Sequence, residues 1–249
     1  MGNKNHTSTP IQITTTIGNL NIVAISAGGY SHSLFLDDNG KVYSCGYNTY
    51  GQLGLGNQND TSTPTQITTT IGGLNIVAIS AGGYGHSLFL DDTGKVYGCG
   101  DNSNGILGNG SLSGNTLTPT RITHTIGNLN IVAISTCSHG HSLFLDDTGK
   151  VYSCGNNYYG QLGLGNQNHT SAPIQITTTI GNLNIVAISA GAYISLFLAD
   201  NGKVYGCGLN NSGQLGLSSN DTINNTPTQI TSNSNIVAIS AGEYHSLFI

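Results

Sequence analysis

The chain has 249 residues, a net charge of −5 and only 7% charged residues, while 37% of its residues are hydrophobic. This balance argues against a nucleic-acid partner, which would call for a basic stripe. No apolar run approaches the ~20 residues needed to span a bilayer, and residues 1–10 lack the apolar segment of a secretory signal. We therefore expect no membrane association and a reducing, cytoplasmic location.

The sequence repeats itself along its length. Five copies of one pattern begin at Asn21, Asn75, Asn130, Asn184 and Asn235. The serine that ends the shared segment NIVAIS falls at Ser26, Ser80, Ser135, Ser189 and Ser240, which gives steps of 54, 55, 54 and 51 residues. A fixed period of this size indicates a repeat architecture. We expect one repeat domain over 1–249, with a frayed N-terminus at 1–9.

The first expected strand of the chain is Pro10–Ile13. Its counterparts are Pro64–Ile67, Pro119–Ile122, Pro173–Ile176 and Pro227–Ile230. A proline at the first residue of a strand suits an edge position, where the missing N–H removes no ladder bond. We therefore place these strands at the outer rim of each unit.

Two apolar strands are expected next. Asn21–Ser26 has consecutive apolar residues, which is typical of a strand covered on both faces. A glycine-containing turn, 27–31, separates it from a second apolar strand, His32–Leu36.

A hairpin and a third strand complete the unit. Asn39-Gly40 is the dipeptide that supplies the positive φ angles of a type I′ turn. Val42–Cys45 is the third strand, and Gly46–Gly56 is a glycine-rich loop that leads to the next proline strand. Four short strands every ~50 residues, without a helical period, indicate a β-propeller or a β-solenoid. Strands covered on both faces favour the propeller, in which blades pack against blades.

The repeat also resembles a known family. AGEYHSL (241–247), GKVYSCG (40–46) and NTYGQLGLG (48–56) are similar to the repeat of the regulator of chromosome condensation family. The resemblance covers nearly the whole chain and implies a β-propeller, usually of seven blades. It also implies protein binding, because the best-known member of the family performs nucleotide exchange on a small GTPase.

The chain departs from the family pattern in the number and content of its repeats. It has about five copies of ~54 residues, and the fifth stops at Ile249, before its third strand. We expect an all-β propeller of about five four-stranded blades, with the last blade closed by both termini or incomplete. We expect Pro10–Ile13 to pair with the C-terminal strands and close the ring, because an open arc would leave strand edges and an apolar blade face exposed.

Two residue series could indicate a metal site, but a structural role explains each better. Cysteines stand where the family usually has tryptophan, and with no Cys-x-x-Cys spacing they are expected to fill the core between blades; they are Cys45, Cys99, Cys154 and Cys207. Histidines precede the second apolar strand, and Ile194 replaces the histidine in the fourth copy. We expect them to be buried struts that hydrogen-bond backbone; they are His32, His86, His141 and His245.

No motif indicates catalysis or a cofactor. The Asp pairs, such as Asp37-Asp38, do not match a calcium loop and suit the solvation of a hairpin. Gly46–Gly51 has phosphate-loop spacing, but Gln52 stands where that motif needs lysine. Cys137 and His139 lie close in sequence without an orienting third group. We therefore expect no enzyme activity, no metal and no cofactor.

The remaining candidate site is a loop surface rich in tyrosine. A propeller would place equivalent turns and loops of successive blades around one rim, and tyrosine with Asn, Ser and Gly is the mixture that adaptable binding surfaces use. An alternative is that each tyrosine packs against the neighbouring blade. The candidate residues of the turns are Tyr30, Tyr84, His139, Tyr193 and Tyr244, and those of the loops are Tyr47, Tyr50, Tyr158 and Tyr159.

Three functions fit this surface. The first is a non-enzymatic scaffold that binds a protein through the loop rims. The second is guanine-nucleotide exchange on a small GTPase, although nearly identical repeats leave little room for one specialised face. The third is a glycan-binding propeller with one Tyr/Asn pocket per blade, although His139 interrupts the tyrosine series.

Overall fold

The computed structural model describes residues 8–29, 31–217, 222–230 and 235–249. The expectation of a frayed N-terminus therefore falls mostly outside the described residues. The described chain is almost entirely β, with one short 3₁₀ turn, η1 (Ser103–Gly105). This confirms the all-β prediction.

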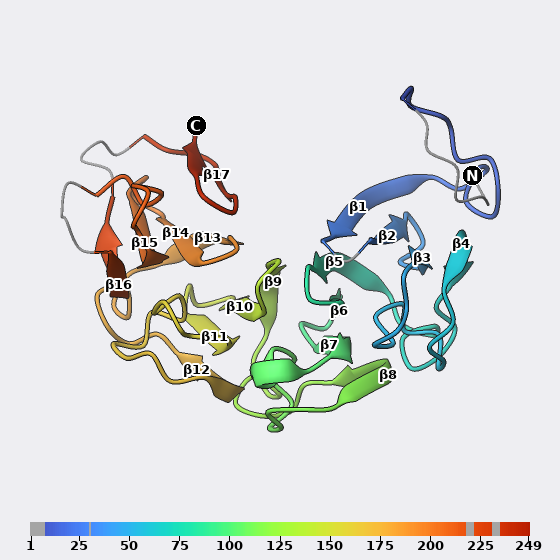
Figure 1. Ribbon diagram of the computed structural model, residues 1–249, viewed down its shortest axis with the longest axis horizontal. Helices are drawn as coiled ribbons and strands as arrows, with labels where there is room; N and C mark the ends of the chain where they lie inside the picture. The colour runs from blue at the N-terminus through green and yellow to red at the C-terminus, as the bar shows by residue number, and fades with distance from the viewer. Residues whose placement is uncertain (1–7, 30, 218–221, 231–234) are drawn as a thin grey trace.

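Four units are antiparallel sheets of four strands, which follow the chain from the centre of the molecule to its outside (Figure 1). The first has β1 (Ile22–Gly28), β2 (His32–Asp37), β3 (Val42–Gly46) and β4 (Thr61–Gln66). The second has β5 (Ile76–Gly82), β6 (His86–Asp91), β7 (Val96–Asp101) and β8 (Asn115–Arg121). The third has β9 (Ile131–Thr136), β10 (His141–Asp146), β11 (Val151–Gly155) and β12 (Thr170–Gln175). The fourth has β13 (Ile185–Ala190), β14 (Ile194–Ala199), β15 (Val204–Leu209) and β16 (Ile223–Gln229).

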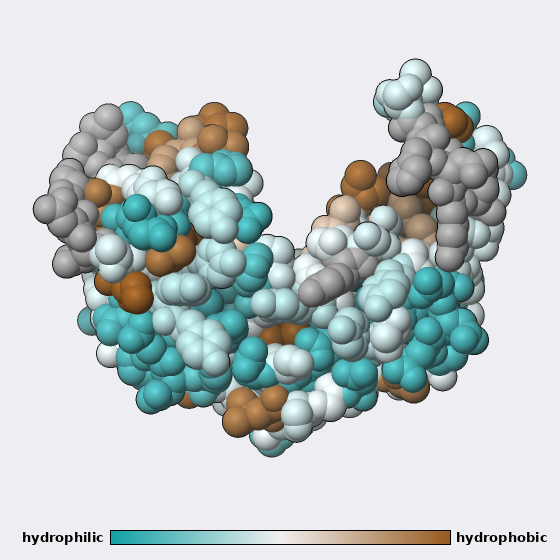
Figure 2. Space-filling model, in the orientation of Figure 1, coloured by the Kyte–Doolittle hydropathy of each residue, from teal (hydrophilic) through white to brown (hydrophobic). Residues whose placement is uncertain are grey.

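In the described residues of the fifth unit, the strands are β17 (Ile239–Ala241) and β18 (Ser246–Phe248). The blades form an arc, with the first blade and the fifth unit at its two open ends (Figure 1). Pro10–Ile13 belongs to no strand and does not pair with β17 or β18, so the structure has the incomplete last blade and not the pairing expected for ring closure. Apolar side chains are accordingly exposed at both ends, as Ile25 (75%) and Val237 (76%) illustrate, and brown surface flanks the gap in Figure 2.

The second strand of each four-stranded blade forms the core. All six residues of β6, β10 and β14 are buried, because each strand has a neighbour on either side in its sheet and a blade against each face. Clusters such as the one around Phe89, Tyr97 and Cys99 join the residues of two successive blades.

The inner strands are less covered than the sequence predicts. In β5 only Ile76, Ala81 and Gly82 are buried, and Val77 is 50% exposed. The pairing with β6 is irregular between Ile76 and Ala78, so Val77 lies in a bulge at the start of the strand. An inner strand also pairs with one strand only. The prediction that this segment is covered on both faces is therefore wrong.

The proline strand is an outer strand, as predicted, but its proline lies within it. Pro64 is the fourth residue of β4, and β4 pairs only with β3. The pairing is irregular between Ser44 and Gly46, opposite the proline, so the missing N–H removes no regular ladder bond.

The hairpin differs from the predicted type I′ turn. Gly40 has a φ of +71°, whereas Asn39 does not have a positive φ. The Gly40 N–H donates to Asp37 O, so the turn is type I followed by a glycine in the left-handed region. Asp37 is buried, and its Oδ1 accepts hydrogen bonds from the N–H groups of Asn39 and Lys41. Only the second aspartate of the pair, Asp38, is exposed to solvent as predicted.

Each blade is held to the next by its long loop. The carbonyl of Gln52, in the loop after β3, accepts hydrogen bonds from the Ser87 hydroxyl (2.8 Å) and the Cys99 thiol (3.6 Å) of the second blade. The carbonyls of Ile106 and Gln161 accept the equivalent serine and cysteine hydrogen bonds at the next two junctions. Cys99, Cys154 and Cys207 are fully buried there, as predicted, whereas Cys45 of the first blade is only partly buried.

Candidate binding rim

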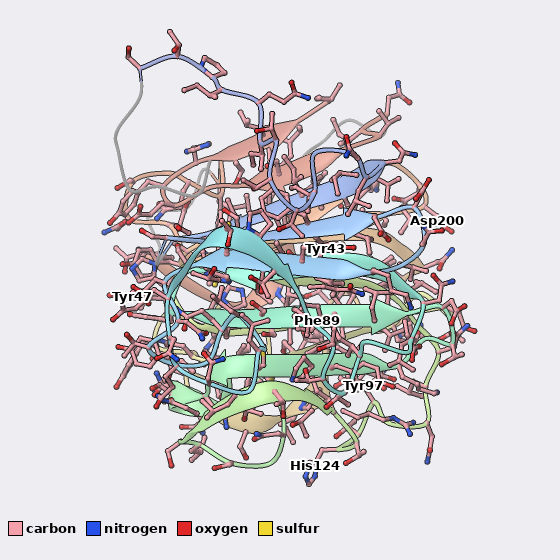
Figure 3. All side chains as sticks on the ribbon, turned by 90° about the vertical axis from the view of Figure 1, so that its right-hand side faces the viewer. Tyr43, Tyr47, Phe89, Tyr97, His124 and Asp200 are labelled. Carbon is pink, nitrogen blue, oxygen red and sulfur yellow. The ribbon has the colours of Figure 1, made fainter. Side chains whose placement is uncertain are left out.

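The turn before the second strand and the loop after the third strand leave each blade at the same end. This follows from the register, in which His32 pairs with Gly46, His86 with Gly100, and His141 with Gly155. Figure 3 shows the result: Tyr47 lies at one end of the strands and Asp200, in a hairpin, at the other. We call the surface formed by these turns and loops the loop rim.

A buried asparagine fixes each rim loop. Asn48 Oδ1 accepts a hydrogen bond from Leu53 N, and its Nδ2 donates to the carbonyls of Asn57 and Asn59. Asn102, Asn157 and Asn210 accept the same bond from Leu107, Leu162 and Leu215. The loops are therefore built on internal polar frameworks. The asparagine recurs at a fixed place in the first four copies, so the repeat itself carries a signal for this framework.

The turns of four successive blades form one aromatic row. The ring centroids of Tyr84 and His139 are 5.6 Å apart, those of His139 and Tyr193 are 4.3 Å apart, and those of Tyr193 and Tyr244 are 5.9 Å apart. The sequence therefore identified residues that the fold brings together. Tyr30 lies outside the described residues.

The loop tyrosines are divided between this row and the outer rim. Tyr159 joins the row through Tyr193, at 5.2 Å between centroids. Tyr47 and Tyr50 contact each other at 6.3 Å. Tyr158 is 63% exposed and contacts His169, a neighbour that the sequence analysis did not identify.

The aromatic row is partly shielded from solvent. Tyr84, His139 and Tyr193 are half-buried, and Tyr244 is 53% exposed. Burial raises the pKa of Tyr193 to about 12, and Tyr244, Glu243 and Tyr159 contribute to the shift. The alternative that the tyrosines pack on neighbouring blades is thus true in part, since Tyr84 also packs against the core of the second and third blades.

The histidine series lies beneath the rim, and its bonds differ from those expected. His32, His86 and His141 are buried as predicted, but His245 is exposed. His32 Nε2 lies 3.0 Å from Ser87 Oγ, so its partner is a side chain of the next blade and not backbone.

The same arrangement recurs with His141 Nε2, which lies 2.8 Å from Ser195 Oγ. Because the Ser195 hydroxyl donates to Gln161 O, the histidine Nε2–H donates to the serine. His86 has no hydrogen-bond partner among the described residues.

Cys137 and His141 form a neutral pair. Cys137 Sγ lies 3.1 Å from His141 Nδ1. Burial raises the pKa of the Cys137 thiol to about 11 and, together with His139, lowers the pKa of His141 to about 3. A thiolate would be the nucleophilic form, so this environment opposes nucleophilic chemistry. Within the described ranges, no group of three His, Cys, Asp or Glu side chains could hold a metal ion.

Charge is distributed unevenly between the two ends of the blades. The Lys and Arg residues that the structure describes all lie at the hairpin end, at the start of a third strand or the end of an outer strand; they are Lys41, Lys95, Arg121, Lys150 and Lys203. The described carboxylates of the rim are Asp60, Asp101 and Glu243. The rim is therefore acidic and aromatic.

Among the described residues, no helix is long and apolar enough to cross a bilayer.

Comparison with known proteins gives one family. A family model described as RCC1-like domain matches residues 1–249. The chain is 34% identical over 227 residues to the probable E3 ubiquitin-protein ligase HERC6 of Homo sapiens. The matched region covers 89% of this chain and 22% of that protein. The chain is 32% identical over 250 residues to the ultraviolet-B receptor UVR8 of Arabidopsis thaliana. This matched region covers 100% of this chain and 55% of that protein. The chain thus spans about half the length of one curated relative and about a fifth of the other.

Solved structures agree with this result. Human WBSCR16 matches with a TM-score of 0.81 and 27% identity, over 93% of this chain and 58% of that chain. Prp20p of Saccharomyces cerevisiae, whose structure was described together with its binding to Gsp1p and histones, matches with a TM-score of 0.79 and 25% identity, over 94% of this chain and 57% of that chain.

Proposed function

Because the chain belongs to the RCC1-like domain family, we propose that it is a non-enzymatic scaffold that binds a protein partner through its loop rim. One observation carries this proposal: the aromatic row of Tyr84, His139, Tyr193 and Tyr244, which takes one ring from each of four successive blades. Partly exposed tyrosines on a rigid scaffold are the usual anchors of protein interfaces.

The chemistry of the rim supports binding over catalysis. Burial keeps the thiol of Cys137 protonated and the imidazole of His141 neutral, and both are committed to internal contacts. The buried asparagine of each loop holds the rim in shape before a partner arrives, which reduces the entropy lost on binding.

The likeness to Prp20p favours a protein as the class of partner, since Gsp1p and histones are both proteins. It also makes nucleotide exchange on a small GTPase the second candidate function. A nucleotide-release assay with a panel of small GTPases tests that candidate: release accelerated by catalytic amounts of the chain would replace the simple scaffold with an exchange factor.

Affinity capture with matched variants tests the scaffold. Tyr244→Ala and His139→Ala change the row, whereas Asp200→Asn changes an exposed hairpin at the opposite end of the blades. We expect each row variant to weaken the binding of a captured partner by up to ~2 kcal/mol, the range of an interface hot spot. The hairpin variant should bind the partner as the wild type does. A partner that is lost with Asp200→Asn and kept with both row variants would contradict the proposed surface.

A further inference from the structure

We propose that a pocket between the first two blades binds the cationic side chain, arginine in preference to lysine, of a partner protein. The pocket has a volume of about 320 Å³ and is lined by Tyr50, Tyr84, Asp101, Ser103 and Asn104. This proposal rests on the proposed scaffold function only in assigning the cation to a protein.

Two tyrosines form walls of the pocket, and each is positioned by a glycine of the following blade. Tyr50 belongs to the loop of the first blade and packs on Gly85 of the second, where a Cβ atom would lie 2.9 Å from Tyr50 Cδ2. Tyr84 packs in the same way on Gly140 of the third blade, also at 2.9 Å. Aromatic faces attract cations, and a planar guanidinium stacks on them better than an ammonium group does.

Asp101 supplies the charge. The residue is only 7% exposed, and its Oδ1 accepts hydrogen bonds from Ser103 N (3.2 Å) and Ser103 Oγ (2.8 Å). Its Oδ2 accepts no hydrogen bond from a residue that the structure describes. A mostly buried carboxylate favours a cation partner, but every described Lys and Arg lies at the opposite end of the blades. An incoming guanidinium would meet this requirement.

The other junctions show what is particular to this pocket. Asn104, His139 and Asn156 hold the equivalent positions between the second and third blades, and Tyr159, Tyr193 and Leu209 hold them between the third and fourth. The carboxylate therefore occurs at one junction only, although aromatic rings recur. Asparagine at the corresponding position of the third blade indicates that Asp101→Asn keeps the fold.

We assign the cation to another protein. A second copy that met this one face to face would present its own rim, which carries no Lys or Arg within the described part of the chain. A face-to-face dimer would instead bring like charges together. The charge pattern therefore favours a basic segment of a different protein.

The test uses the purified full chain and two short peptides, acetyl-Gly-Arg-Gly-amide and its citrulline analogue, which is similar in shape but neutral. Nuclear magnetic resonance titration follows the amide signals of Ser103 and Asn104. We expect these signals to shift with the arginine peptide, and the affinity to fall at least about tenfold with citrulline or with Asp101→Asn, since both remove a charge-assisted contact. Asp60→Asn, which removes a rim carboxylate outside the pocket, is the matched control and should change the affinity less than about twofold.

Several outcomes would overturn the proposal. They are equal binding of the arginine and citrulline peptides, equal binding by wild type and Asp101→Asn, and shifts confined to other parts of the rim. Binding of a neutral oligosaccharide such as chitotriose at Ser103 and Asn104, without binding of the arginine peptide, would assign the pocket to glycans.

The results also separate this proposal from the scaffold. Capture of a partner whose binding depends on Tyr244 but not on Asp101 would contradict the proposed cation site and support the scaffold function. Arginine binding at Asp101, without any partner that depends on the aromatic row, would support the site and contradict the scaffold.

Discussion

The side-chain oxygen of Ser135 accepts a hydrogen bond of 3.0 Å from the backbone N–H of Ala190, in the inner strand of the next blade. The same bond joins Ser26 to Ala81, Ser80 to Thr136 and Ser189 to Ala241. The serine that ends each of the first four NIVAIS segments is therefore a connection between blades. It forms a line of hydrogen bonds around the centre of the arc.

We expect Ser135→Ala to lower the free energy of unfolding by about 1–3 kcal/mol, because it leaves a buried N–H unpaired. Ala190 is 8% exposed, so water cannot readily replace the hydroxyl. Ser240→Ala is the control, since Ser240 is exposed in the last unit, and should stay within about 0.5 kcal/mol. Urea melts measure the free energy of unfolding of both variants. Equal losses of stability would show that the bond from Ser135 to the next blade contributes nothing to stability.

The buried histidines should contribute to stability in a way that the exposed histidine does not. His141→Ala removes the bond to Ser195 and the contact with Cys137, and we expect a loss of about 1–3 kcal/mol. His245→Ala occupies the same repeat position but is exposed, and should change stability by less than about 0.5 kcal/mol. Comparable denaturation midpoints for the two variants would contradict the role of His141 as a strut.

Acid should destabilise the fold before its carboxylates are protonated. Burial lowers the pKa of His32 to about 4 and, with neighbouring histidines contributing, lowers those of His86 and His141 to about 3, against an ordinary value of 6.5. Below pH 6.5 the unfolded chain therefore binds protons that the folded chain does not. Stability is fully present above pH 6.5 and is lost as the pH falls toward 4 and 3, by about 2 kcal/mol per histidine at pH 5.

The variant His86→Ile provides the comparison, because Ile194 fills the same position in the fourth blade and is fully buried. It should reduce the loss of stability between pH 7.5 and pH 5 by about the contribution of one histidine. Urea melts at the two pH values measure this difference. A wild-type stability that does not change over this range would mean that the histidines are accessible to protons in the folded state.

Gly100 should tolerate no side chain. It has a φ of +99°, and a Cβ atom there would lie 2.2 Å from the Gly85 carbonyl oxygen and 3.1 Å from Gln52 Cα in the neighbouring loop. We expect Gly100→Ala to cost more than about 1 kcal/mol, from backbone strain and overpacking together. Gly73→Ala is the control, because no atom lies within 4 Å of its Cβ position and its φ is not positive; it should be neutral or stabilise by up to about 1 kcal/mol. Thermal melts that rank the two variants in the opposite order would contradict this description of the loop contact.

The periodicity of the sequence was sufficient to predict the repeated blades, whereas the predicted type I′ hairpin turn was wrong. The repeat of NIVAIS set the number of units, and the prolines placed β4 and its counterparts on the outside, because both signals recur at the same place in successive repeats. The local details that failed depend on tertiary context. Whether Pro64 begins a strand or lies inside it depends on the irregular pairing with β3, and the exposure of Val77 depends on a bulge opposite β6.

The aromatic row of the candidate site was predictable from the sequence, but the pocket beside it was not. Equal repeat positions implied that Tyr84, His139, Tyr193 and Tyr244 would lie around one rim, and the structure places them in one row. The pocket at Asp101 was not predictable, because Tyr50 reaches it from the preceding repeat. Contacts across a repeat boundary leave no signal in the repeat itself.

The long loop of each blade contacts the next blade, so a binding pocket of the rim forms at the junction between two blades. Tyr50 and Asp101 belong to different repeats, yet they line one pocket, so neither repeat specifies it alone. Reordering the repeats would therefore preserve every blade while replacing the pockets between them. Insertion of a single repeat would break one junction and create two new ones, each pairing a loop with a turn that it had not met. In such an array, new specificity can arise by shuffling whole units without changing a residue in any of them.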